Sequence, residues 1–230
     1  GAVIGAEALV RRIGEDGSVC APFEFVHMME EENLISVVDY EMLEQSCRLL
    51  KEVGEHWPGF QLSCNMSRNT LAELDYLDLI DDILTRTGVD HSQLIFEVTE
   101  SSRGLQLESI EDRLNALKAR GIAVAVDDMG TECSCLEMLY LPQLDLVKID
   151  RSLISKTGHG PREQAVIGSL IDLCHKLGLG CIAEGIETKE QGELLKSLGC
   201  DRLQGYYFGR PMPPEEFFAR FGPGMQEHRI

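Results

Sequence analysis

The sequence lacks several features that would assign it to common classes of protein. Its 230 residues contain no apolar run near the ~20 residues that a membrane-spanning helix requires. Positive charge is scarce, with 21 Lys and Arg against 39 Asp and Glu, so the formal net charge is −18. Because DNA, RNA and anionic membranes bind clustered basic side chains, the composition argues against these partners. A phosphate ligand would need metal ions to mediate its binding.

Three sequence motifs are also absent. There is no C-x-x-C pair, and neither the eight cysteines nor the six histidines have the spacing of a zinc site. We therefore interpret the cysteines as free thiols of a reducing cytosol, and the histidines as structural or surface residues. No G-x-G-x-x-G follows an apolar run, which disfavours a dinucleotide-binding fold. The start GAVIGAEAL has no initiator Met and no secretory signal, which predicts a domain excised from a longer protein. We expect this domain to be cytoplasmic, or to be the cytoplasmic part of a membrane-anchored protein.

The sequence does contain a regular alternation of two kinds of segment. Seven short apolar runs have the length and composition of strands, and amphipathic stretches that mostly end at glycine lie between them. Continuous apolar strands indicate burial on both faces of a parallel sheet. We therefore expect a single α/β domain over residues 1–230, either a barrel or a doubly wound sheet. The predicted strands cover 6–11, 60–67, 93–100, 122–128, 144–150, 180–187 and 201–209, and the predicted helices cover 36–54, 79–88, 110–121, 164–178 and 189–199.

Polar side chains stand where the apolar strands end. At any one position an Asp or Glu after a strand is as readily a helix cap or a turn residue, but six strands in succession favour a shared site. In a (β/α)8 barrel the carboxyl ends of the strands open onto one face, where the active sites of that fold are built. The residues concerned are Asn65, Glu97, Glu100, Asp127, Asp128, Lys148, Asp150, Glu184, Glu187 and Gln204.

The residue types at these ends indicate a metal site. Carboxylates that converge on one face repel one another unless cations lie among them, and oxygen ligands suit Mg²⁺ or Mn²⁺ rather than zinc. On a regular strand Asp127 and Asp128 would point to opposite faces, so the chain must turn for both to reach metals, and Gly130 offers the backbone freedom. Lys148, flanked by apolar residues, is expected to face a specific partner.

These motifs together resemble the EAL-type cyclic di-GMP phosphodiesterases. The letters EAL stand at Glu7–Leu9, and NMS, EVTES, DDMG, VKIDRS, AEGIET and QGYYFGRPMP follow in the family's order as far as about Pro213. The resemblance implies a modified TIM-type (β/α)8 barrel with an antiparallel first strand, a homodimer, and an upstream sensory or GGDEF-type domain in the full-length protein. The implied reaction is hydrolysis of cyclic di-GMP to linear pGpG by a water that two divalent ions, Mg²⁺ or Mn²⁺, activate. Ca²⁺ should inhibit because it prefers larger, looser coordination.

The resemblance also implies a role for each site residue. The metal ligands would be Glu7, Asn65, Glu97, Asp127 and Asp128. The catalytic residues around the water would be Lys148, Asp150, Glu184, Glu187 and Gln204. Either Glu184 or Asp150 could accept the proton of the water, and the residues leave this choice open. The substrate would contact Leu9, Arg11 and Pro211, while Glu100 would support the loop after the aspartates.

The loop after the aspartates departs from the family pattern. It reads DDMGTECSCL, where active members read close to DDFGTGYSSL. Glu132 in place of glycine is the largest change, since glycine reaches backbone angles that strain a glutamate. Cys133 and Cys135 invite a redox-switch or metal interpretation, but cysteines one residue apart form a disulfide only with difficulty, and loop packing is the alternative. The conformation of residues 129–135 and their coupling to dimerisation are therefore in question.

Two other functions remain as alternatives. A degenerate domain could bind cyclic di-GMP without hydrolysing it and signal through a partner. Such domains lose metal ligands, and none is lost from this sequence. Another metal-dependent barrel enzyme, for example one that abstracts a proton beside a carboxylate, would leave Asn65, Gln204 and the EAL segment unexplained.

Overall fold

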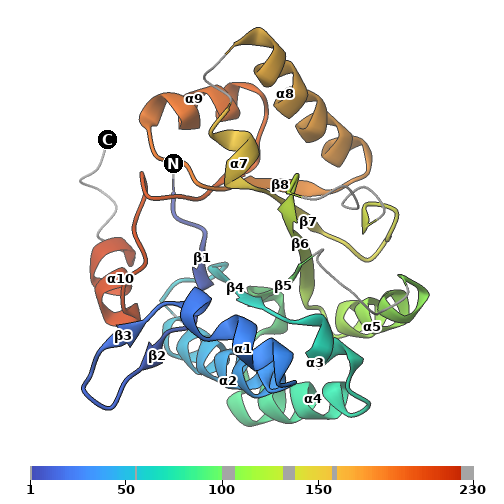
Figure 1. Ribbon diagram of the computed structural model, residues 1–230, viewed down its shortest axis with the longest axis vertical. Coiled ribbons are helices and arrows are strands. Elements are labelled where there is room, and N and C mark those ends of the chain that lie inside the picture. Colours follow the sequence, from blue (N-terminus) through green and yellow to red (C-terminus); the bar gives the residue numbers. More distant parts are fainter. Residues whose placement is uncertain (1, 55, 100–106, 132–137, 157–159, 224–230) are drawn as a thin grey trace. The chain divides into compact units, whose positions relative to one another are not determined.

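The computed structural model describes residues 2–54, 56–99, 107–131, 138–156 and 160–223 (Figure 1). The chain divides into two compact units, described separately below. The first unit comprises residues 1–97, 119–122 and 211–230, and the second unit comprises residues 98–118 and 123–210. Within the described ranges, none of the helices combines the length and apolar character needed to cross a membrane.

The first unit contains three strands joined by parallel pairing. Strand β1 (Gly5–Ala8) pairs with β4 (Gln61–Asn65), and β4 pairs with the start of β5 (Leu94–Thr99). The expected antiparallel first strand is not confirmed, because β1 runs in the same direction as β4. Parallel neighbours need a long crossover, and helices supply it on both occasions. These helices are α1 (Val26–Glu31) and α2 (Ile35–Val53) before β4, then α3 (Arg68–Ala72) and α4 (Tyr76–Thr87) before β5.

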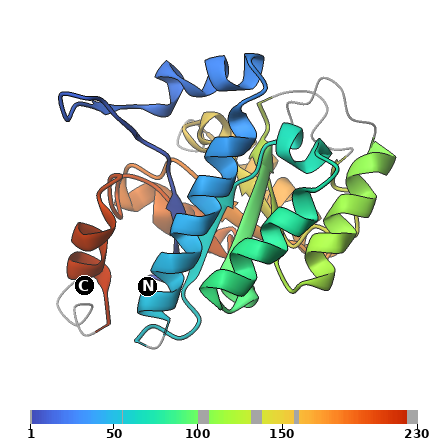
Figure 2. The same cartoon turned by 90° about the horizontal axis from the view of Figure 1, so that it is seen from below.

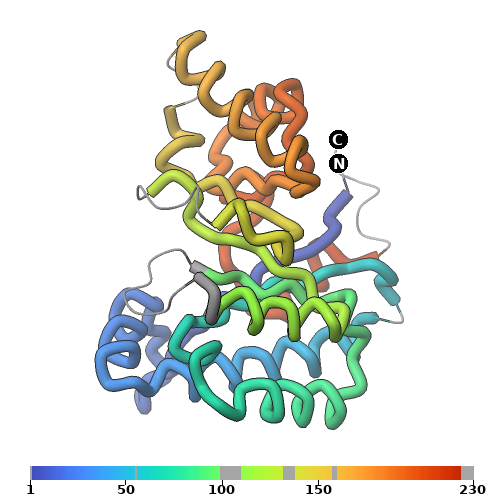
Figure 3. Tube along the Cα trace, turned by 90° about the vertical axis from the view of Figure 1, so that its right-hand side faces the viewer, coloured from blue at the N-terminus to red at the C-terminus, as the bar shows by residue number. Residues whose placement is uncertain are grey.

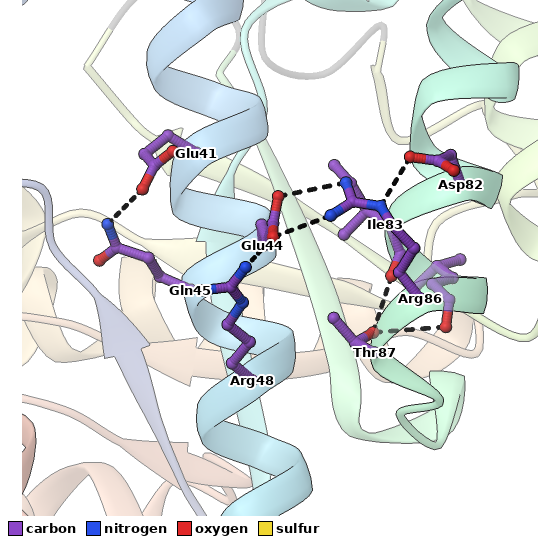
Figure 4. A network of polar contacts seen from close by, with 9 residues as sticks. Glu41, Glu44, Gln45, Arg48, Asp82, Ile83, Arg86 and Thr87 are labelled. Atoms are coloured by element: carbon purple, nitrogen blue, oxygen red, sulfur yellow. Dashed lines mark hydrogen bonds and ion pairs between the residues drawn. The ribbon is translucent and has the colours of Figure 1, made fainter.

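Helices α2 and α4 pack side by side in the first unit, where Figure 2 shows them running along the strands. Their inner faces bury apolar side chains, among them Leu43 and Leu50 of α2 and Ile80 of α4. On their outer surface Glu44 accepts hydrogen bonds from Arg86, at 2.9 and 3.2 Å, and also from Arg48 (Figure 4). Apolar contacts on the inner faces and the Glu44–Arg86 hydrogen bonds on the outer surface therefore both join the two helices.

Several short elements of the first unit have no counterpart in the sequence prediction. Most of them span six residues or fewer, too little for a hydrophobic period to show. They comprise the antiparallel pair β2 (Arg12–Ile13) and β3 (Val19–Cys20), the 3₁₀ turns Pro22–Glu24 and His91–Gln93, and helix α10 (Pro214–Phe221).

In the described part of the second unit, four strands pair in parallel in chain order. Each of β6, β7 and β8 pairs with the next strand along the chain. Helices α8 and α9 lie next to each other at the top of Figure 3, and an added Cβ at Gly168 would lie 3.5 Å from Leu198. The strands are β6 (Ala123–Met129), β7 (Leu146–Ile149), β8 (Gly180–Ala183) and β9 (Arg202–Leu203), and the helices are α5 (Leu107–Ala119), α7 (Arg151–Ile154), α8 (Pro161–Lys176) and α9 (Lys189–Ser197).

The predicted alternation of strands and helices is confirmed. Each of the seven predicted strand segments overlaps a strand, and each of the five predicted helix segments overlaps a helix. Glycine ends helix α4 as expected, since Gly88 adopts a left-handed conformation with φ of +62° and its amide donates to Leu84. The apolar runs are buried, as Val124, Val126 and Val147 show.

Candidate metal and active site

Three predicted metal ligands of the first unit lie on one face of its parallel strands. Glu7 of β1 is level with Ser63 of β4, and Asn65 of β4 is level with Glu97 of β5. Residues two apart on a strand share a face, so Ser63 and Asn65 point the same way. The strand register therefore places the side chains of Glu7, Asn65 and Glu97 on a common face.

Contacts among these three residues agree with that placement. The Asn65 side-chain amide donates to Glu7 Oε1 over 3.3 Å. Glu97 is only 1% exposed, and its backbone carbonyl accepts from the Met66 amide at 2.9 Å. A carboxylate this buried requires hydrogen-bonding or cationic partners. One amide and two carboxylates form a set of oxygen donors suited to a hard divalent cation.

The residues expected to contact substrate lie close to the ends of the first unit's elements. Leu9 and Arg11 directly follow β1, and Leu9 is exposed. The Arg11 guanidinium donates to the carbonyl of its neighbour Val10 at 2.7 Å. Pro211 is exposed and precedes helix α10. Their contact with a phosphodiester remains a prediction.

In the second unit the chain turns at the paired aspartates, as the sequence requires. Asp128 has a left-handed φ of +59°, and its amide donates to Asp127 Oδ1 at 2.8 Å. The pairing of β6 with β7 is irregular at this point. Gly130 follows with φ of +106°, and a Cβ there would lie 2.2 Å from Leu153 Cδ1. Only glycine fits at this position, and the turn frees the two aspartates from the usual alternation of faces.

Lys148 has the specific partners that its apolar flanks predict. Its side chain is 1% exposed, and its ammonium lies 2.8 Å from Glu184 Oε1 and 3.3 Å from Asp127 Oδ1. Three charged groups from β6, β7 and the residue after β8 therefore meet at the carboxyl ends of these strands. A buried lysine is tolerated when carboxylates balance its charge, and in turn it holds those carboxylates in a fixed orientation.

The remaining predicted catalytic residues occupy less central positions in the second unit. Asp150 caps helix α7, since its Oδ1 accepts from the Ser152 amide at 2.7 Å. Glu187 is half exposed and pairs with Arg151 at 3.6 Å. The backbone of Gln204 bonds to Ala183 and Ile186, which places this residue beside the end of β8. Glu100 and the segment Glu132–Cys135 lie outside the described residues.

The described cysteines are free, as the sequence analysis predicts: Cys20, Cys47, Cys64, Cys174, Cys181 and Cys200. Burial raises the pKa of Cys47 to about 11 and that of Cys64 to about 12. Neutral buried thiols of this kind are poor nucleophiles, and these two residues serve as core side chains.

One group of possible ligands has no signal in the sequence. The side chains of His175, Cys181 and Asp201 each place a donor atom within 4.8 Å of the others. They come from a helix, a strand and the residue before another strand, so no motif spacing connects them. The interpretation of the histidines as structural or surface residues stays a prediction, and the His175 side chain is 39% exposed.

Alternating strands and helices, with polar and charged side chains at the carboxyl ends of the parallel strands of each unit, define the class of (β/α)8-type proteins. Within that class, the chain belongs to the EAL domain family, whose model its residues 1–211 match.

Two similar proteins and one solved structure agree with this assignment. MucR of Pseudomonas aeruginosa, named a bifunctional diguanylate cyclase/cyclic di-GMP phosphodiesterase, is 34% identical over 95% of this chain and 32% of MucR. RocR of the same organism, named a cyclic di-GMP phosphodiesterase, is 31% identical over 94% of this chain and 55% of RocR. The solved PaMucR phosphodiesterase in complex with c-di-GMP superposes with a TM-score of 0.84 at 32% identity, covering 93% of this chain and 87% of that chain. The fold class is therefore a (β/α)8-type barrel. The chain spans about half or less of the length of the two curated relatives, MucR and RocR.

Proposed function

We propose that this chain hydrolyses cyclic di-GMP to linear pGpG with two bound divalent ions, Mg²⁺ or Mn²⁺. The names of MucR and RocR support the substrate, since both are cyclic di-GMP phosphodiesterases. The oxygen donors of the first unit and the turned aspartates of the second unit support the choice of metal. The ligands of the proposal are Glu7, Asn65, Glu97, Asp127 and Asp128.

The single observation that carries the proposal is the contact of Lys148 with both Glu184 and Asp127. A domain that only binds a dinucleotide has no need to bury an ammonium between two carboxylates. Here the lysine holds the Asp127 carboxylate in place for a cation and offers a donor to an attacking water. Metal ions bound at the carboxylates would make such a water more acidic and offset charge on the phosphate.

Two carboxylates compete as the acceptor of the water's proton. Glu184 gives one oxygen to Lys148, and Asp150 gives one oxygen to the Ser152 amide. Gln204 and Glu187 flank the same end of β8 and are proposed to position these groups. The pH profiles of Glu184→Gln and Asp150→Asn decide between the two, since loss of the true acceptor removes the acidic limb of the profile.

The test is incubation of the metal-free protein with cyclic di-GMP, with and without Mg²⁺ or Mn²⁺, followed by chromatography for pGpG. We expect product only with metal, and loss of turnover when Ca²⁺ replaces Mg²⁺ because Ca²⁺ prefers a looser shell. Tight binding without any product would overturn the proposal and favour a receptor that signals through a partner.

The remaining proposals concern the surroundings of the site. Leu9, Arg11 and Pro211 are proposed to contact the substrate, and Glu100 to support the loop after the aspartates. We further propose a homodimer in the cytoplasm, and a sensory or GGDEF-type domain in the full-length protein. The name of MucR, which pairs a diguanylate cyclase with a phosphodiesterase, supports the last point. Sedimentation of the protein with and without cyclic di-GMP tests the dimer.

A further inference from the structure

A second group of ligand-type side chains lies in the second unit, apart from the carboxylates of the active site. His175 is in the last turn of α8, Cys181 is in β8, and Asp201 directly precedes β9. In the parallel pairing of β8 with β9, Ile182 is level with Arg202, so Cys181 is level with Asp201. The fold thus brings Asp201 next to His175 and Cys181, which precede it by 26 and 20 residues.

The three donor atoms form a compact triangle. Asp201 Oδ2 lies 3.0 Å from His175 Nε2 and 3.2 Å from Cys181 Sγ, and His175 Nε2 lies 3.9 Å from Cys181 Sγ. Around a tetrahedral zinc ion, with Zn–S of about 2.3 Å and Zn–N and Zn–O of about 2.0 Å, ligand atoms lie about 3.3 to 3.6 Å apart. Each side of the triangle needs only a small adjustment to reach that geometry.

The surroundings of the triangle suit a metal ion with one open position. Cys181 is fully buried, whereas the side chains of His175 and Asp201 are 39% and 42% exposed. The protein therefore supplies one side of the site, and water reaches the other. The Cys181 amide donates to Asp201 Oδ2 at 2.8 Å, which anchors the carboxylate beside the thiol without any metal present.

We propose that His175, Cys181 and Asp201 bind a zinc ion, with water as the fourth ligand. A thiol, an imidazole and a carboxylate together are a donor set that zinc prefers and that Mg²⁺ does not. The ion would join the end of α8 to the starts of β8 and β9. It stabilises this corner of the second unit and takes no part in phosphodiester hydrolysis.

The zinc site is distinct from the proposed active site. Cys181 stands near the start of β8, and Glu184 directly follows the end of that strand. Three residues of extended strand separate their Cα atoms by about 10 Å. The two sites also differ in chemistry, because the proposed ligands of the active site are all oxygen donors.

Cobalt provides a spectroscopic test, because a thiolate bound to Co²⁺ gives a charge-transfer absorption that oxygen ligands do not. The reduced, metal-free protein is titrated with Co²⁺ and then with Zn²⁺, which should displace it. We expect one equivalent of thiolate-bound Co²⁺ in the wild type and none in Cys181→Val. His175→Gln should weaken binding at least about tenfold, in line with the loss of a ligand contact.

Two matched variants separate this site from other sources of binding. Cys20→Ser removes a free thiol of the first unit that lies outside the triangle, and it should keep the full absorption. Asp127→Asn, which disrupts the proposed active site, should also keep it. Absence of the band in the wild type, or its persistence in Cys181→Val, overturns the zinc site and leaves the phosphodiesterase proposal untouched. Circular dichroism checks that each variant is folded.

Discussion

The two ends of strand β8 hold opposite kinds of chemistry. After its carboxyl end, Glu184 meets the buried ammonium of Lys148 and, through it, Asp127. Near its amino end, the thiol of Cys181 meets a half-exposed carboxylate and imidazole. The first cluster contains a cation that the protein itself provides, whereas the second combines a thiol, an imidazole and a carboxylate. Donor chemistry, rather than the strand itself, decides which ion each end suits.

The largest effect is expected when the cluster of Lys148, Glu184 and Asp127, at the carboxyl end of β8, is disrupted. Asp127→Asn should lower Mg²⁺-dependent hydrolysis of cyclic di-GMP by about a hundredfold or more, the scale on which single charge-stabilising groups act in catalysis. The fold should persist, because asparagine has nearly the same shape. Glu7→Gln should have the same effect, and Asp172→Asn, on the exposed side of α8, is the matched control. Retained turnover in Asp127→Asn would refute its assignment as a metal ligand.

The next effect concerns the stability of the same end. Lys148→Met should lower the free energy of unfolding by about 3 to 5 kcal/mol, because it leaves the carboxylates of Asp127 and Glu184, whose side chains are 12% and 17% exposed, without their cation. Urea denaturation measures the change, and Lys176→Met, at an exposed ion pair, is the control.

A double variant tests whether the loss of stability in Lys148→Met comes from the charge of the carboxylates that it leaves without a partner. Adding Glu184→Gln to Lys148→Met should restore part of the lost stability, since one unbalanced charge is then removed. If Lys148→Met were as stable as the Lys176 variant, Lys148 would not hold the carboxylates together.

The turn that presents the aspartates should be the next most sensitive point. Gly130→Ala places a side chain on a left-handed backbone and against Leu153. It should therefore lower the free energy of unfolding by about 2 to 5 kcal/mol. Gly178→Ala has a similar φ of +77° but open space around it, and should cost only about 1 to 2 kcal/mol. Equal losses in thermal denaturation would show that the contact with Leu153 is unimportant.

A smaller effect is expected at the amino end of β8. In metal-free protein, Cys181→Val should change the free energy of unfolding by less than about 1.5 kcal/mol, because it exchanges one small buried side chain for another of similar size. Added zinc should then stabilise the wild type and not the variant. A loss as large as that of Lys148→Met would mean that the thiol is structurally essential without metal.

The smallest effect comes from a buried carboxylate of the first unit. Asp39 is 6% exposed and accepts from the Ser67 amide and the Thr70 hydroxyl, and its burial raises the pKa of its carboxyl group above 3.8. The folded state therefore binds the proton more tightly than the unfolded chain does. Relative to Asp39→Asn, the wild type should gain stability as pH falls from the raised pKa towards 3.8. A difference that does not change with pH in urea denaturation would contradict this.

The sequence predicts the strands that recur along the chain and the polar residues at their ends. Continuous apolar runs indicate the buried strands, and the residues at their ends indicate Asn65, Asp127 and Lys148 before any contact is known. The need for a turn at Asp128 also follows from simple alternation of faces.

What the sequence does not predict depends on contacts between distant segments. His175, Cys181 and Asp201 meet only because β9 pairs beside β8 and α8 ends next to both. Asp150 is a candidate catalytic residue from its position, yet its described contact is that of a helix cap. Four-residue elements such as α7 span barely one helical turn, which is too little for a repeating apolar pattern to show.

The common face of Glu7, Asn65 and Glu97 has a consequence for how this protein tolerates change in length. Because faces alternate at every residue, deletion of one residue inside β4 ahead of Asn65 would turn its side chain to the far side, away from Glu7. Deletion of two residues would restore the side while shortening the strand. Insertions and deletions should therefore accumulate in the connections of the first unit. Within its strands they should be rare, and those that occur should add or remove an even number of residues.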